Sequence, residues 1–208
     1  MGQKGGNGSP SKAQERPLQR RSAWLQLQLA GVEPPARMVG LFAARALLPH
    51  DIERLIEVCL RSMREEDAGA SLLLAPLAEP PLTWKITVAG SAAAAPHDCT
   101  VRVHAIGDPG SPHRGLLQHI ALLDEEMGRA TRESVEPAET YLVITSGRLD
   151  EQGRIHAFQN LVALFTTALG ALIVDPAAAM VTMDPGEWAD AMEMSLEVED
   201  GMKLLRKK

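Results

Sequence analysis

Two aspartates, each followed by proline, are the first residues whose types and spacing suggest chemistry in this chain. Asp175 and Asp184 stand on either side of the stretch AAAMVTM. Two carboxylates in one cleft, with their pKa values pushed apart by their surroundings, could act as general acid and general base. However, Asp184, Pro185 and Glu187 are also spaced like a helix N-cap, a first helical residue and a capping-box partner. We therefore interpret both aspartates as turn and cap residues, and keep them as candidates for contact with a small ligand.

A second candidate site lies where a buried strand ends in the sequence TSGR. Thr145, Ser146 and Arg148 follow the apolar run YLVI. In open α/β sheets, ligands bind in the crevice outside the carboxyl ends of the strands. Many buried strands end in polar residues without binding a ligand. These three residues can therefore be interpreted either as a binding site or as an ordinary strand end.

The histidines and cysteines do not have the spacing of a metal site. His113 and His119 are six residues apart, which is about 240° around a helix axis, so they cannot share a face. His104 alternates along its strand with the apolar residues Val101, Val103 and Ala105, which predicts that its side chain faces solvent. Cys59 and Cys99 form no CxxC pair, and we expect both to be buried free thiols. P-loop, GxSxG and HExxH motifs are absent, so no metal, cofactor or catalytic residue is expected.

The hydrophobic pattern predicts the elements that would position these residues. Alternating residues in AWLQLQLAG, at 23–31, indicate a half-buried strand. Further strands are predicted at 70–77, 82–90, 99–107, 138–147, 171–175 and 178–183. The apolar run at 37–48 fits a strand or a helix, with the strand slightly favoured. Helices are predicted at 50–66, after Ser111, at 150–169 with Gly170 as C-cap, and after Asp184.

The order of these elements predicts an α/β (α+β) fold. From residue 99 onward, strands and helices alternate, which favours at least partly parallel pairing through crossover connections. We expect one mixed sheet with helices packed on it, in a single compact domain at 23–196. Residues 1–22 are predicted to be a disordered basic arm, and 197–208 a charged tail.

Composition excludes several classes of function. The net charge is −6 and aromatic residues make up 3% of the chain, which argues against a phosphate-tracking or base-stacking surface for nucleic acid. The longest apolar stretch, at 161–174, is shorter than the ~20 residues needed to cross a bilayer. We therefore expect a cytoplasmic protein that binds neither nucleic acid nor membrane.

The span 139–191 resembles the C-terminal part of a bacterial family catalogued as domain of unknown function 4261. The similar features are the strand ending in TSG, the helix sequence NLVALFTTALGA, the strand running into VDP, and Trp188 after the following turn. The resemblance covers about a quarter of the chain. Some members of the family lie near toxin delivery and immunity loci, so the resemblance implies a protein that binds a cognate protein.

Together these observations favour a non-enzymatic protein-binding module, with an immunity or accessory role in a toxin or secretion system. Trp188 and Met192 lie in a methionine-rich segment, which is more often part of a core but could form a pliable partner-binding surface. A homodimer is compatible with the same pattern. The alternative is a hydrolase-like enzyme with its site near Ser146, Asp175 and Asp184. A third hypothesis is a scaffold subunit that exposes an apolar patch when isolated.

Overall fold

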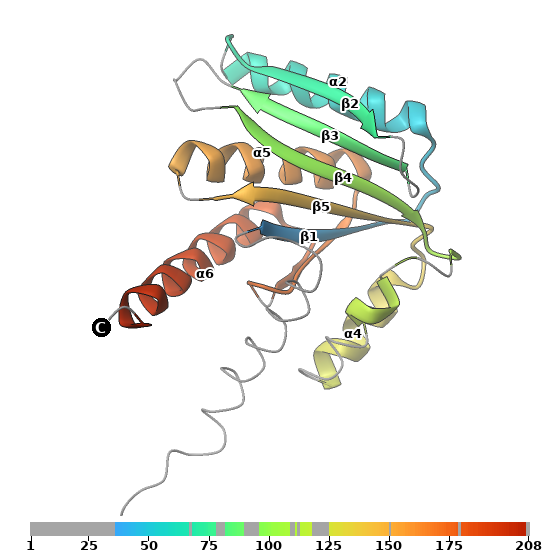
Figure 1. The fold of residues 1–208 in the computed structure, drawn as a ribbon. Coiled ribbons are helices and arrows are strands. Elements are labelled where there is room, and N and C mark those ends of the chain that lie inside the picture. Colours follow the sequence, from blue (N-terminus) through green and yellow to red (C-terminus); the bar gives the residue numbers. More distant parts are fainter. Residues whose placement is uncertain are drawn as a thin grey trace, which may run out of the picture.

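One seven-stranded sheet forms the centre of the protein (Figure 1). A computed structural model describes residues 36–66, 68–77, 82–89, 96–108, 111, 113–117, 125–149, 151–178 and 180–206. Its strands are β1 (Ala36–Ala43), β2 (Ser71–Leu77), β3 (Leu82–Ala89), β4 (His97–Ala105), β5 (Thr140–Arg148), β6 (Leu172–Asp175) and β7 (Met180–Thr182). Its longer helices are α2 (Pro49–Glu66), α4 (Glu125–Val135), α5 (Gln152–Leu169) and α6 (Pro185–Arg206). The predicted basic arm at 1–22 and the predicted strand at 23–31 lie outside the described residues.

The sheet has the strand order β2-β3-β4-β5-β1-β6-β7, and every described pair is antiparallel. The predicted single sheet with packed helices is confirmed, but the expected parallel pairing is wrong. The crossover from β5 through α5 to β6 does produce two strands that run in the same direction. Because β1 lies between these two strands and pairs with both, they form no parallel ladder with each other.

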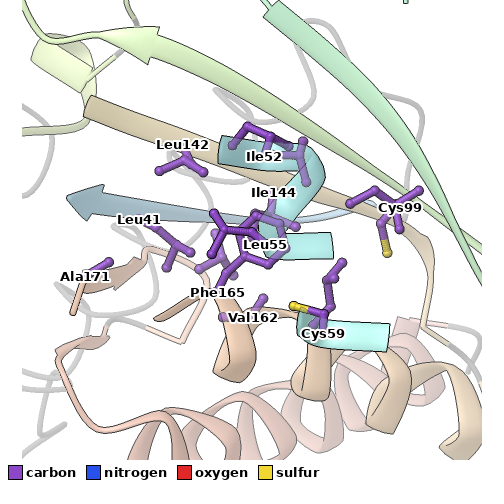
Figure 2. Packing of buried hydrophobic residues seen from close by; sticks show 14 of the residues in the cluster. Leu41, Ile52, Leu55, Cys59, Cys99, Leu142, Ile144, Val162, Phe165 and Ala171 are labelled. Carbon is purple, nitrogen blue, oxygen red and sulfur yellow. The ribbon is translucent and has the colours of Figure 1, made fainter. Parts of the chain in front are cut away.

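The larger part of the core lies between one face of the sheet and the helices α2, α5 and α6. Figure 2 shows Ile52, Leu55 and Cys59 of α2 among side chains from α5 and the sheet, including Phe165 and Ile144. These residues recur at helical spacing on α2 and at every second position on the strands, so each element buries one face. We call the side of the sheet that α2, α5 and α6 cover the helix-covered face.

The C-terminal end of α5 lies at the glycine that the sequence predicted, whereas that of α6 lies further along the chain than predicted. Gly170 adopts a left-handed conformation with φ of 58°. Helices commonly end at a glycine in this conformation. Ala171 donates its N–H to the carbonyl of Thr166, which completes the last turn of α5. The C-cap predicted at Gly170 is therefore confirmed. The last helix differs from the prediction, because α6 continues to Arg206 through most of the segment expected to be a charged tail.

A smaller apolar cluster lies on the opposite face of the sheet, around β1, β5 and β6. Phe42, Tyr141, Val143 and Val174 pack there against Leu116 from the helical turn at 113–117. The helix predicted after Ser111 is described as two pieces, this turn and α4; residues 118–124 between them lie outside the described residues. Among the described residues, the same side of β2 and β3 is not covered by a helix (Figure 1).

Candidate functional site

Asp175 is a fully buried member of an ion pair that the sequence did not reveal. Its Oδ2 accepts hydrogen bonds from Arg37 Nη2 at 3.0 Å and from Arg37 Nε at 3.3 Å. The indole Nε1 of Trp188 donates to the same oxygen at 2.9 Å. The other oxygen, Oδ1, accepts the backbone N–H groups of Ala177 and Ala178 at 2.9 and 3.1 Å. Both oxygens are thus occupied, and the carboxylate ties β1, β6 and α6 together.

Asp184 has a different environment and a different task. Its exposed Oδ1 accepts the N–H groups of Gly186 at 2.8 Å and Glu187 at 3.3 Å. It therefore caps the N-terminus of α6, and the predicted cap is confirmed. One aspartate is buried in an ion pair and the other is exposed at a helix cap, so Asp175 and Asp184 do not form a shared acid pair.

Ser146 lies beside a histidine for which the sequence suggested no role. Nε2 of His97, on β4, is 2.7 Å from Oγ of Ser146, on β5, and both side chains are buried. Ser146 Oγ also donates to the carbonyl of Gly147 at 3.0 Å. The strand was predicted to begin at Cys99, but β4 begins at His97, and the alternation of His97, Cys99 and Val101 could have revealed this. A hydroxyl in contact with an imidazole is the pairing used to activate a serine nucleophile.

These residues form one polar strip on the helix-covered face, made of His97, Ser146, Arg37 and Asp175. Arg37 is opposite Ser146 in the β1–β5 register, and its guanidinium reaches Asp175 on the far side of β1. The structure therefore brings together two of the five predicted ligand contacts. The other three are elsewhere: Thr145 points to the opposite face, Asp184 caps α6, and the side chain of Arg148 lies outside the described residues.

Trp188 and Met192, predicted to contact a partner, are core residues. Both side chains have 0% exposure, and the ring of Trp188 meets that of Phe158 edge-on at a centroid distance of 6.1 Å. A partner could reach them only if α6 moved away from the sheet, so the structure corrects this assignment. The exposed methionines of the segment are Met183 and Met194, at 62% and 67%.

A histidine cluster surrounds Tyr141 on the face opposite the polar strip. The rings of His104 and His113 lie 6.2 and 6.3 Å from the ring of Tyr141, measured between centroids. Nδ1 of His113 is 2.8 Å from Oγ of Ser111. His104 is buried rather than solvent-facing, which corrects the prediction from strand alternation. The reason is tertiary, because Tyr141 and the apolar cluster to which it belongs cover this face at the C-terminal end of β4.

Close packing fixes Tyr141 at the centre of this cluster. A Cβ atom added at Gly40 would lie 2.7 Å from Cε2 of the tyrosine ring, so glycine alone leaves room for the ring over β1. Burial raises the pKa of Tyr141 and keeps its hydroxyl protonated. Burial is also the largest cause that lowers the pKa of His104 and of His113. Nearby Asp108 partly opposes the effect at His104, whereas Arg102 and His113 add to it.

We expect the two histidines to make folding less favourable in acid. Because their folded-state pKa values are lowered, the unfolded chain binds protons more readily, and the free energy of unfolding falls as pH drops below about 6.5. Replacing His104 with glutamine is expected to flatten this dependence in urea titrations between about pH 5 and 8. His50→Gln, at a side chain that is 71% exposed, is the control. An unchanged pH dependence in His104→Gln would contradict the prediction.

Within the described part of the chain, no three His, Cys, Asp or Glu side chains are grouped so that they could hold a metal ion. None of the helices described is both long and apolar enough to cross a membrane. No protein-family model, curated protein or solved structure matches the chain. The resemblance of residues 139–191 to domain of unknown function 4261 stays a prediction.

Proposed function

We propose that this chain is a non-enzymatic protein-binding module, and that its binding surface is the side of β2, β3 and β4 that points away from α2. We call this surface the open face. Its exposed and half-buried side chains include Leu73, Ala75, Leu77, Lys85, Thr87, Asp98, Thr100 and Arg102.

The observation that carries this proposal is the exposure of two leucines on β2. Leu73 is 68% exposed and Leu77 is 41% exposed, and both lie on the open face. Apolar side chains that cluster on a surface and are bordered by polar groups are typical of protein interaction sites. The border here includes the ion pair between Lys85 Nζ and Asp98 Oδ2 at 2.7 Å.

Charge and resemblance support a cognate protein as the partner. The chain has a net charge of −6, which steers association with a basic protein and disfavours an acidic one. The resemblance of 139–191 to the bacterial family implies an immunity or accessory role beside a toxin or secretion component. The polar strip does not compete with this proposal, because its buried groups bond to one another.

The proposal is tested with Leu77→Lys, which places a charge in the open face, and Met194→Lys, which changes a more exposed side chain on α6. Wild-type protein should recover a partner from the native host, and the purified pair should form a complex of fixed stoichiometry. Leu77→Lys should weaken the measured Kd by about tenfold or more, the loss of about 1.4 kcal/mol. Met194→Lys should leave it unchanged. A complex that is insensitive to Leu77→Lys, or no partner at micromolar concentration, would overturn the proposal.

The contact between Ser146 and His97 favours a second candidate, a hydrolase-like enzyme. Oγ of Ser146 is within hydrogen-bonding distance of the imidazole, as an activated nucleophile requires. The burial of both side chains is the reason that we place this function second. A fluorophosphonate probe should label wild-type protein at Ser146 and leave Ser146→Ala unlabelled. Wild-type protein that stays unlabelled would remove this candidate.

A further inference from the structure

We infer that two copies of this chain pair through the outer edges of β2, antiparallel to each other, so that the two sheets become one. This inference goes beyond the proposed function, which concerns a different protein on the open face. It starts from the place of β2 at the end of the sheet order, where β3 is its one neighbour among the described strands.

The edge of β2 lacks most of the features that keep edge strands apart. Unpaired N–H and C=O groups on such an edge bind another strand unless charge, proline, a bulge or shortness prevents it, and of these features β2 contains only Pro76. β2 has seven residues, SLLLAPL, none of which is charged. Its register with β3 is continuous over all seven pairs. The opposite edge of the sheet, β7, is a strand of three residues.

Pro76 indicates which backbone groups of β2 point outward. Proline has no N–H, so in a sheet it fits where that group would point away from the neighbouring strand. Pro76 is opposite Trp84 of β3, and we infer that this pair is not joined by hydrogen bonds. Leu72 and Leu74 then share the outward orientation of Pro76, because hydrogen-bonding direction alternates along a strand.

These outward groups set the register of the paired copies. A two-fold axis at Leu73 places Leu72 of one copy opposite Leu74 of the other, on both sides of the axis. Each of these two residue pairs can exchange two backbone hydrogen bonds. Pro76 is then opposite Ala70 of the second copy, outside the central bonds. The exposed Leu73 side chains meet across the axis on the open face and bury each other.

The self-complementary edge favours a second copy as the partner, because Leu72 pairs with Leu74 of the other copy and Leu73 meets Leu73. The net charge of −6 on each chain opposes the pairing, and the uncharged β2 adds no local repulsion to it. One pair of strands buries less than the ~1,600 Å² of a standard stable interface. The dimer is therefore weak and dissociates on dilution, and its two open faces form one continuous surface.

Disulfide crosslinking tests the register directly. Residues opposite each other without hydrogen bonds have Cα atoms about 4.5 Å apart, which a disulfide can bridge. Leu73→Cys should therefore form a covalent dimer under mild oxidation. Leu77→Cys is the matched control on the same strand, because its two copies would lie about 27 Å apart. The natural thiols will not interfere, because Cys59 and Cys99 are buried, which raises the pKa of each to about 12.

We expect Leu73→Cys to crosslink at least about tenfold faster than Leu77→Cys at equal concentration. In sedimentation velocity, the wild-type chain should shift from monomer to dimer as its concentration rises. Leu73→Lys should stay monomeric, and Met194→Lys should behave like the wild type. Equal crosslinking of the two cysteine variants, or a wild-type chain that remains monomeric at high concentration, would overturn the inference. Neither result would affect the test of the proposed function, which measures binding of a different protein to Leu77→Lys.

Discussion

Replacing Asp175 with alanine is expected to lower the free energy of unfolding by about 3–5 kcal/mol, because it leaves the charge of Arg37 buried without its partner. The variant also removes the acceptor for Trp188 Nε1 and for the N–H groups that follow β6. For a chain of this size, the midpoint of thermal unfolding should fall by about 10 °C. Urea and thermal denaturation measure both quantities.

Two variants make this prediction specific. Asp184→Ala removes only the N-cap of α6 and should cost about 1 kcal/mol. Adding Arg37→Met to Asp175→Ala should restore part of the loss, because no unpaired charge then remains in the core. If Asp175→Ala cost no more than Asp184→Ala, the ion pair would not hold β1, β6 and α6 together as described.

Trp188→Ala should also cost about 3–5 kcal/mol, because it empties the space of the largest fully buried side chain among the described residues. Trp188→Phe keeps most of the ring but removes the indole N–H, and should cost about 1–3 kcal/mol. Met194 lies on the same helix and is 67% exposed. Met194→Ala is therefore expected to change stability by less than about 0.5 kcal/mol. All three values are measured by urea denaturation of the purified chain.

The outcome also decides between two explanations of Trp188. A core residue affects folding, whereas a partner-binding residue affects association and leaves the stability of the isolated chain nearly unchanged. The indole and Asp175 share a hydrogen bond, so the effects of Trp188→Phe and Asp175→Ala should be less than additive. A stable Trp188→Ala variant that loses partner binding would return Trp188 to the interaction surface.

Local sequence determined most of the elements of this protein, because their signals are periodic or act within a few residues. The pattern over 82–90 and 99–107 predicted strands at the positions of β3 and β4, and the structure pairs these two strands. The cap at Asp184 and the stop at Gly170 depend on backbone groups within four residues of each position. Such interactions form wherever those residues occur, so no tertiary information is needed to find them.

Tertiary structure alone decided how the strands pair and which polar residues meet. Because β1 lies between β5 and β6 and is antiparallel to both, the sheet has no parallel pair there. The spacing of hydrophobic residues along a strand does not specify which strands become its neighbours. Arg37 reaches Asp175 across 138 positions of sequence, and His97 reaches Ser146 across 49. The burial of His104 depends on the residues that cover β4. The exposure of Leu73 depends on the position of β2 as an edge strand. A local pattern shows which face of a strand is apolar, but the covering of that face is a property of the whole packed chain.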